Sequence, residues 1–335
     1  MIKTSLYIIG AILGAGFASG KEIHLFFGKY GTIGYIGIII ASVIIGAIIY
    51  KTTQIATKNK INTYEEFLKT IGSQNQIIQK IINIFILITY YIMNSAFAEY
   101  FKQELNIPKT IGIAVIAALS YLTTRKKENK IIKINTILIP ILIIIIITFG
   151  IKNINQEATI TQTSQEIIPS ITSAIIYASY NSITLIPILI TITQTIKTKK
   201  QVKTISIITT LTLIILATAI NITIQNIDQN INQIELPTIY QARKEGKIAQ
   251  NTYGTVIITS IYTTAITTLY SYLKNNTKTE KEYKIKNAII CTSSIIISNI
   301  SFTTLLNKIY PIFGIIGLIQ IYKIFAITLE KKAQN

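Results

Sequence analysis

Residues 131–150 read IIKINTILIPILIIIIITFG, and this stretch decides the class of fold. It holds the uninterrupted run Ile143–Ile147 and one basic residue, Lys133, near its start. An α-helix needs about 20 mainly apolar residues to cross the hydrocarbon core of a bilayer. Isoleucine and threonine favour strands in water, but in lipid a helix satisfies every backbone polar group internally. We therefore predict a membrane-spanning helix here.

The same criterion, applied along the chain, predicts an all-α integral membrane protein with about ten transmembrane helices. The spans are expected near residues 4–28, 31–50, 78–101, 108–123, 131–150, 167–193, 204–224, 252–273, 286–302 and 306–328. An alternative interpretation of the first span is a signal peptide that is cleaved after Gly16-Phe17-Ala18. The nine further spans favour a multi-pass protein.

The composition excludes several other classes of protein. Of the 335 residues, 50% are hydrophobic and only 14% are charged, and the formal net charge is +18. A soluble domain carries roughly 25% charged residues. The single cysteine, Cys291, cannot form a disulfide framework, and a disordered chain would be less hydrophobic. A soluble nucleic-acid binder would not carry such long apolar runs, so the expected partners are the lipid bilayer and a small-molecule solute, with no nucleic acid.

Basic residues predict how the chain sits in the membrane, because cytoplasmic loops collect Lys and Arg. If the N-terminus lies inside, 22 of the 32 Lys and Arg residues fall in inner segments and 9 in outer segments. An even number of spans places both ends of the chain on one side. We therefore expect both termini to be cytoplasmic.

The spacing of the spans predicts one internal repeat within a single transporter domain, 1–335. The first five-helix repeat covers 1–150 and the second covers 151–335. Because five is odd, the second repeat is inverted relative to the first. Inverted repeats with broken helices at matching positions are typical of secondary transporters, which bind their substrate at the repeat interface. The sequence predicts such breaks in helices 1 and 6.

The first predicted break is GAILGAGFASG, residues 10–20. Each of its four glycines weakens a helix by close to 1 kcal/mol relative to alanine. Glycine also lets backbone N–H groups approach a ligand. The two Gly-x-x-x-Gly spacings equally suit close helix packing, so both interpretations stay open for Gly10 and Gly20. The candidate substrate-binding residues of this break are Gly14, Ala15, Gly16, Phe17 and Ser19.

The second predicted break is YASYNS, residues 177–182, which lies between Pro169 and Pro187. Prolines loosen the helical hydrogen-bond ladder. The residues between them supply hydroxyl groups, an amide and aromatic walls. A polar stripe that bonds neighbouring helices is the alternative interpretation. The candidate substrate-binding residues here are Tyr177, Ser179, Tyr180 and Asn181.

The string GAGFASGKEI, residues 14–23, followed by Phe26-Phe27, resembles the YkvI-type family of uncharacterised bacterial and archaeal membrane proteins. Its first four residues also resemble the first-helix motif of the amino acid–polyamine–organocation superfamily, which has the five-plus-five (LeuT-type) fold. The resemblance is most specific over residues 7–31. It implies that the backbone N–H groups of Ala15, Gly16 and Phe17 hold a substrate carboxylate, in line with the attraction of helix N-termini for anions. Sodium-coupled members often place an Asn just after the glycine pair, where this chain has Phe17 and Ala18, so no ion site of that kind is implied.

The candidates for ion coupling come from three segments. The resemblance implies a sodium site made by the hydroxyl groups of Thr263 and Thr264 and the carbonyl groups of Gly10 and Leu13. Oxygen ligands suit a hard cation. Charged residues inside a membrane are costly and usually functional, so Glu99 and Glu22 are candidates for carrying a coupling proton, and His24 is a weaker one. Each could equally be an interfacial group that reaches water.

These patterns predict a secondary transporter that moves a small carboxylated solute, an amino acid or a related compound, by alternating access. The expected coupling ion is sodium or a proton, and no other cofactor or metal is expected. The sequence has no phosphate-binding loop and no nucleophile–base pair, so neither ATP hydrolysis nor an enzyme is indicated. The resemblance implies the plasma membrane of a prokaryote. A non-transporting nutrient sensor built on the same fold is the alternative.

Overall fold

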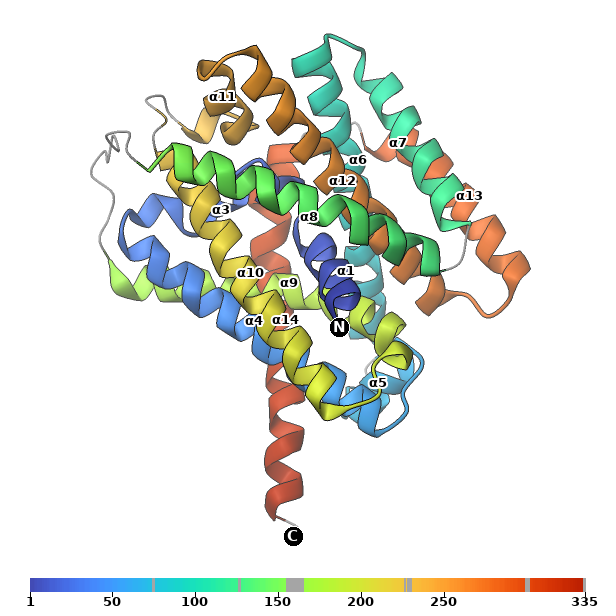
Figure 1. The fold of residues 1–335 in the computed structure, drawn as a ribbon. Helices are drawn as coiled ribbons and strands as arrows, with labels where there is room; N and C mark the ends of the chain where they lie inside the picture. Colours follow the sequence, from blue (N-terminus) through green and yellow to red (C-terminus); the bar gives the residue numbers. More distant parts are fainter. Residues whose placement is uncertain are drawn as a thin grey trace.

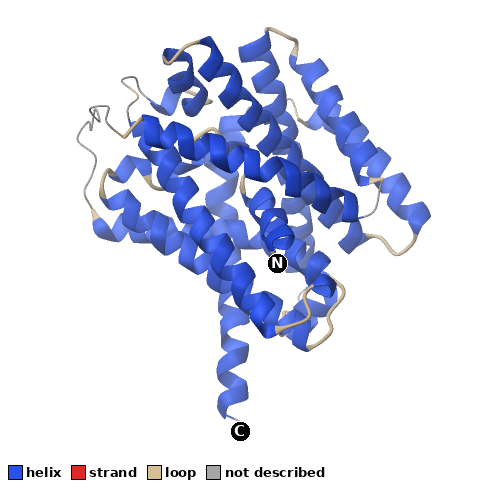
Figure 2. Cartoon of the chain, viewed as in Figure 1, coloured by secondary structure: helices blue, strands red, loops and turns tan. Residues whose placement is uncertain are grey.

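A computed structural model describes residues 1–73, 76–125, 128–154, 166–225, 227, 231–298 and 302–333. Within these ranges all regular secondary structure is helical, so the prediction of an all-α protein is confirmed (Figure 2). The first helices are α1 (Ile2–Ile12), α2 (Ala15–Ala18), α3 (Lys21–Phe26), η1 (Gly28–Tyr30), α4 (Ile33–Lys58), α5 (Tyr64–Thr70), α6 (Gln76–Leu105), α7 (Lys109–Thr124) and α8 (Glu128–Lys152). They are followed by α9 (Ile167–Ile192), η2 (Thr193–Thr195), α10 (Lys199–Gln225), η3 (Ile231–Gln233), α11 (Pro237–Lys244), α12 (Lys247–Asn276), α13 (Glu280–Ile297) and α14 (Phe302–Ala333).

Seven helices in the described part of the chain are long and apolar enough to cross a membrane. Their apolar segments are Ile33–Lys58, Gln79–Leu105, Lys130–Lys152, Ile167–Thr195, Lys199–Gln225, Lys247–Asn276 and Ile309–Ile327. Helices α1 and α7 are apolar but shorter. The chain is therefore a multi-pass membrane protein.

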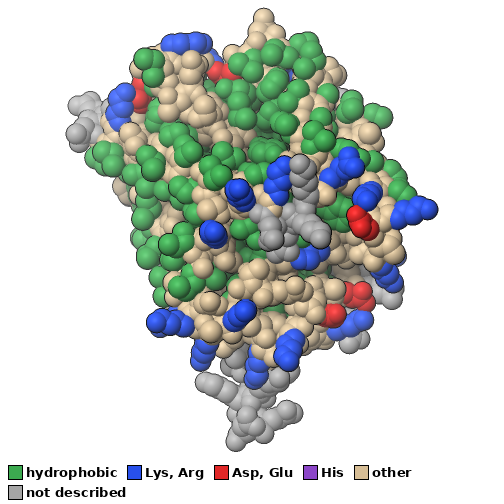
Figure 3. All heavy atoms as spheres, turned by 45° about the vertical axis from the view of Figure 1, so that its right-hand side comes forward, with side chains coloured by type: hydrophobic (Ala, Val, Ile, Leu, Met, Phe, Trp, Pro, Cys, Tyr) green, Lys and Arg blue, Asp and Glu red, His purple; other side chains and the backbone are tan. Residues whose placement is uncertain are grey.

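The outer surface shows why these helices need lipid. On α8, Ile137, Ile141 and Ile144 are more than half exposed, whereas Ile139 and Leu142 on the opposite face are buried. Figure 3 shows hydrophobic side chains over a broad area of the upper and left-hand parts of the visible face, with Lys and Arg at its top, across its middle and right-hand side, and along its bottom. Such apolar exposure is unfavourable in water and favourable against lipid chains.

Helix α1 lies at the centre of the bundle and contacts α8, α9, α10 and α12. The two short helices α5 and α11 lie at opposite ends of the molecule (Figure 1). We refer to these ends as the α5 end and the α11 end. The helix that leads into the glycine-rich segment is therefore packed between four neighbouring helices.

The predicted break in the sixth span is wrong, because α9 runs without interruption from Ile167 through Ile192. Its polar side chains bond to their own helix: Ser179 Oγ donates to the Ile175 carbonyl at 2.7 Å, and Asn181 Nδ2 donates to the Tyr177 carbonyl at 3.0 Å. Backbone carbonyls can accept these extra bonds while the helix stays intact. Pro187 lies inside the helix and removes only one backbone donor.

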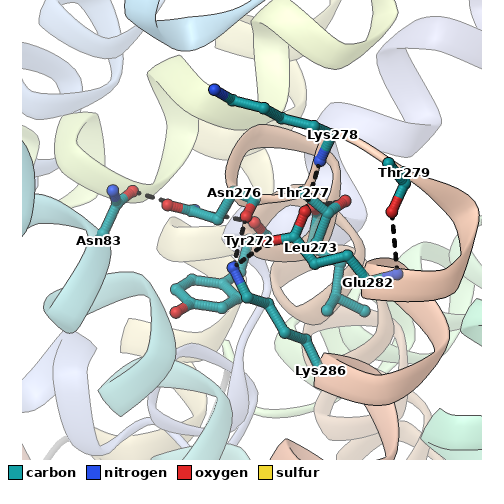
Figure 4. Close-up of polar contacts among 9 residues, drawn as sticks. All are labelled: Asn83, Tyr272, Leu273, Asn276, Thr277, Lys278, Thr279, Glu282 and Lys286. Atoms are coloured by element: carbon teal, nitrogen blue, oxygen red, sulfur yellow. Dashed lines mark hydrogen bonds and ion pairs between the residues drawn. The ribbon is translucent and has the colours of Figure 1, made fainter.

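Capping bonds define the turn between α12 and α13 (Figure 4). Thr279 Oγ1 accepts the N–H of Glu282 at 3.2 Å, and the Glu282 carboxylate accepts the N–H of Lys278 at 2.9 Å. Lys286 Nζ donates to the Asn276 carbonyl at 2.7 Å. The bond from Lys278 and the neighbouring Lys286 lower the pKa of Glu282. A carboxylate with a lowered pKa stabilises the fold above its unfolded-state pKa, and that contribution is lost as the pH falls.

Replacing the cap residue, Thr279→Ala, is expected to destabilise the protein by about 1 kcal/mol, because a first-turn N–H of α13 loses its acceptor. The thermal unfolding midpoint in detergent measures the effect. The exposed Thr292 is the matched control, since its hydroxyl donates to Ala288 within the same helix and Thr292→Ala leaves no helix end uncapped. Equal midpoints for the two variants would contradict the assigned role of Thr279.

Candidate functional site

The helical path of the first segment is interrupted at Leu13 and Gly14. Helix α1 ends at Ile12, Gly14 is fully extended (φ −75°, ψ −175°), and α2 begins at Ala15. The sequence predicted a break over residues 10–20, and within it the structure is non-helical at residues 13–14 and again at residues 19–20. Among the described residues, none accepts a hydrogen bond from the N–H groups of Ala15, Gly16 and Phe17. The first N–H groups of a helix always lack intrahelical partners.

Thr264 of α12 closes the other side of this interruption. Its Oγ1 lies 3.0 Å from the carbonyl oxygen of Gly10 and 3.3 Å from that of Leu13. The neighbouring Thr263 is fully buried, and its hydroxyl donates to the Ser260 carbonyl within α12 at 3.1 Å. The structure therefore brings together Thr264, Gly10 and Leu13, with Thr263 beside them and turned toward its own helix.

A tight turn after α2 folds the chain back on itself. Gly20 adopts φ +77°, and a Cβ there would come within 2.7 Å of the Ile224 side chain. Only glycine adopts this left-handed conformation without strain. Ser19 is buried and donates to the Gly16 carbonyl at 3.3 Å. The turn directs α3 back over α2, which brings Glu22 against Gly16.

Glu22 is buried in the middle of the protein, with 4% of its surface exposed. Tyr180 of α9 donates its hydroxyl to Glu22 Oε2 at 2.6 Å. The Glu22 carboxyl group lies directly over Gly16, so a Cβ on Gly16 would overlap it. The chain thus places its own carboxylate where the sequence predicted a substrate carboxylate.

A small cavity of about 30 Å³ lies between Glu22 and Thr264. This volume admits about one water-sized group. The cavity is lined by Ala11, Ile12, Gly14, Glu22, Phe85, Thr89, Met93, Tyr180, Asn181, Thr184, Thr264 and Tyr310. These residues come from α1, α3, α6, α9, α12 and α14, so the cavity lies where the interrupted first segment meets α9.

The cavity collects only part of the predicted site. Of the predicted residues, those that line it are Gly14, Tyr180, Asn181, Glu22 and Thr264. Those that do not line it are Gly10, Leu13, Ala15, Gly16, Phe17, Ser19, Tyr177, Ser179 and Thr263. The sequence analysis missed Phe85, Thr89 and Met93, which share one face of α6 at four-residue spacing, and also Thr184 and Tyr310. The spacing on α6 was visible in the sequence, but ordinary core residues show it too.

An aromatic layer separates this cavity from a larger cleft. The cleft has a volume of about 470 Å³ and lies between α3, α9 and α14. Phe26 lines the cleft and Tyr180 lines the cavity, and their ring centroids are 5.5 Å apart. Tyr180 in turn stacks on Tyr310 with centroids 4.5 Å apart. One pair of rings therefore closes the cavity on this side.

The α11 end covers the turn between α2 and α3. The N–H of Thr238 donates to the Ser19 carbonyl, and its Oγ1 donates to the Ala18 carbonyl, both at 3.0 Å. Lys21 Nζ donates to the Ile234 carbonyl at 2.7 Å. These bonds tie the segment that enters α11 directly to the backbone beside the cavity.

Glu99 lies apart from the cavity, near the α11 end. It forms an ion pair with Lys109 of α7 and accepts a hydrogen bond from Gln103 at 2.9 Å. The nearby Glu235 is half-buried, and burial together with the charge of Glu99 raises its pKa. A coupling role for Glu99 stays a prediction. His24 lies on α3, partly buried, and does not line the cavity.

The arrangement of helices matches that of a known transporter. The chain superposes on three crystal structures of variants of the Eremococcus coleocola manganese transporter, each with a TM-score of 0.52. The match covers 99% of this chain and 73% of the transporter chain at 12% identity, so it concerns the fold alone. The protein is thus a multi-pass membrane protein with a transporter fold.

The sequence comparisons identify particular relatives. The chain is 25% identical over 328 residues to the uncharacterized membrane protein YkvI of Bacillus subtilis, covering 92% of this chain and 91% of YkvI. It is 21% identical over 324 residues to the uncharacterized protein YyaD of the same organism, covering 95% and 94%. No family model matches the sequence. The predicted resemblance to YkvI is confirmed over nearly the whole chain.

Proposed function

We propose that this protein is a secondary transporter that moves a small amino acid or related zwitterion by alternating access, coupled to sodium or protons. The observation that carries the proposal is the small cavity between the interruption at Leu13–Gly14, helix α9 and Thr264. Transporters with inverted repeats bind substrate at such a position.

The element order supports a ten-helix, five-plus-five inverted repeat. Counting α1–α3 as one span, the first unit is completed by α4, α6, α7 and α8, and the second by α9, α10, α12, α13 and α14. Each unit carries one short helix between its second and third spans: α5 in the first and α11 in the second. The position of α5 and α11 at opposite ends of the molecule supports an inverted relation between the two units (Figure 1).

The chemistry of the cavity supports a zwitterionic solute. The carboxylate of Glu22, which lines the cavity, suits an ammonium group. The N–H groups of Ala15, Gly16 and Phe17 donate to no described residue but lie outside the cavity lining, so they become available to a solute carboxylate only when the Glu22 side chain moves away from Gly16. A solute that carries both charges satisfies both sets of groups. At about 30 Å³ the cavity is too small for an amino acid, so binding requires that it widens by movement of the aromatic layer or of the α11 end.

Sodium coupling would use the oxygen atoms around Thr264. The carbonyl oxygens of Gly10 and Leu13 converge on its hydroxyl within 3.3 Å, and hard cations prefer such ligands. Proton coupling would use Glu22. The distribution of Lys and Arg along the sequence supports a topology with the α5 end and both termini in the cytoplasm of a prokaryotic cell and with α11 outside.

Flux measurements in liposomes test the proposal. Purified protein is reconstituted, and uptake of radiolabelled glycine, alanine and β-alanine is followed with an inward sodium gradient, a proton gradient or neither. We expect uptake of at least one solute above protein-free vesicles, and collapse of the driving gradient should abolish accumulation. Binding of the solute without flux under any gradient would contradict transport and favour the nutrient-sensor alternative.

A disulfide crosslink tests whether the α11 end must move during transport. The experiment is simple to design because Cys291 is the single native cysteine. In a Cys291→Ser background, the pair Ser19→Cys and Thr238→Cys joins two residues whose backbones are hydrogen-bonded at 3.0 Å. Oxidation should fix the α11 end over the cavity and stop flux, and reduction should restore it. Undiminished flux in the fully crosslinked protein would exclude movement at this end.

A further inference from the structure

Among the described residues, the buried carboxylate of Glu22 has no positively charged partner. Its described contact is the hydroxyl of Tyr180, at 2.6 Å, and no Lys, Arg or His within the described ranges forms an ion pair with it. On its own helix, Lys21 instead reaches the carbonyl groups of Ile231 and Ile234. A buried carboxylate is costly unless a cation or a proton compensates it.

Three other carboxylates in the described chain have buried side chains, and each of them forms an ion pair with a basic residue. Glu99 pairs with Lys109, Glu104 pairs with Arg243 at 2.6 Å, and Glu245 pairs with Lys152 at 2.7 Å. Each of these three side chains is less than 10% exposed, as Glu22 is. Within the described residues, each of these three carboxylates is therefore neutralised by a basic side chain, whereas Glu22 is not.

The cavity beside Glu22 has the properties of a cation site. Among the residues that line it are four with side-chain oxygen atoms, Thr89, Asn181, Thr184 and Thr264, together with Met93 and aromatic residues, and no basic residue is among the described lining residues. The stacked rings of Tyr180 and Tyr310 add aromatic faces, which attract cations. Its volume of about 30 Å³ suits one water-sized group. An ammonium group or a bare alkali-metal ion has about that size.

We propose that Glu22 binds a monovalent cationic group in this cavity, either the ammonium group of the solute or an alkali-metal ion. This inference rests on the proposed transport function for the identity of the solute, but it concerns binding at equilibrium. The cationic group pairs with the Glu22 carboxylate, while Tyr180 keeps the second carboxylate oxygen in place.

Thermal unfolding of the purified protein tests the proposal without any flux measurement. The baseline buffer contains N-methylglucamine as the cation, which is too large for the cavity. Sodium, potassium, methylammonium, β-alanine and propionate are then titrated separately, since a ligand that binds the folded state raises the unfolding midpoint. We expect stabilisation by β-alanine or methylammonium if the solute supplies the cation, by sodium or potassium if an alkali ion does, and none by propionate.

The decisive variant is Glu22→Gln, which keeps the size of the side chain and an acceptor for Tyr180 but removes the charge. We expect its affinity for the stabilising cation to fall at least tenfold, while its midpoint in the baseline buffer rises. Glu104→Gln is the control, because that carboxylate already has Arg243 as a partner, and its cation affinity should stay as in the unchanged protein.

Three results would overturn the proposal: an unchanged cation affinity in Glu22→Gln, equal stabilisation by propionate, or no stabilisation by any of the cations. Stabilisation that follows pH alone would assign a proton as the partner of Glu22 and would likewise overturn it. Cation binding that depends on Glu22 in a protein without flux would refute transport and leave this inference standing. Flux that is indifferent to Glu22→Gln would refute this inference alone.

Discussion

The variant Gly16→Ala is expected to be destabilised by about 1–3 kcal/mol and to lose solute binding, because the new Cβ occupies the position of the Glu22 carboxyl group. Alanine gains close to 1 kcal/mol over glycine in a helix. That gain is offset twice: the crowded Glu22 side chain must move, and it then loses the bond from Tyr180, which is worth about 1.5–3 kcal/mol for a charged acceptor. The balance is therefore unfavourable.

Two further variants make this expectation specific. In Gly14→Ala the new Cβ would lie 3.5 Å from the Met93 methyl group and 3.7 Å from the Thr264 methyl group, which is ordinary contact, so the unfolding midpoint should change little. The double variant Gly16→Ala, Glu22→Ala removes the overlapping side chain and should recover most of the loss. Strictly additive free energies of unfolding in this cycle would mean that Gly16 and Glu22 do not interact as the structure shows.

The sequence predicted the parts of the site that depend on local chemistry. Glycines at 10, 14 and 16 indicated an interrupted helix, and the interruption lies within one or two residues of the predicted position. The resemblance placed Thr264 beside the carbonyl groups of Gly10 and Leu13, and the structure has these three groups in contact. Long apolar runs fixed the helices because lipid leaves a chain few other ways to pair its backbone.

The parts that the sequence did not predict depend on tertiary geometry. Glu22 reaches Gly16 only because Gly20 reverses the chain in a left-handed turn, and nothing in the residue pattern gives the direction of that turn. The polar stretch 177–182 looked like a break, but its side chains bond to carbonyl groups of the same helix, which stays continuous. A polar residue in a membrane helix is compatible with a broken helix and with a continuous one, and its tertiary contacts determine which of the two forms.

The variant Thr264→Val is expected to be less stable than the unchanged protein, because it loses the hydroxyl group between α12 and the end of α1. Valine has nearly the shape of threonine, so the packing of α12 is kept while the hydroxyl that bridges Gly10 and Leu13 is lost. Two buried carbonyl groups then lose their donor, at a cost of about 1–3 kcal/mol. Thr263→Val is the matched control for stability, because the Thr263 hydroxyl donates within its own helix and its loss frees no group of α1.

The effect of sodium on the unfolding midpoint distinguishes two roles for Thr264: a structural bridge between α1 and α12, or a ligand of a sodium ion. If Thr264 only fastens α1 to α12, the variant is less stable, but added sodium chloride shifts its unfolding midpoint as much as it shifts that of the unchanged protein. If these oxygen atoms bind sodium, the sodium-dependent shift disappears in Thr264→Val, and sodium-driven uptake falls at least tenfold. We expect the second result, with a smaller loss in Thr263→Val. Because the carbonyl groups of Gly10 and Leu13 stay in place in both variants, a sodium response that survives the loss of both hydroxyl groups would reject this pair as ligands.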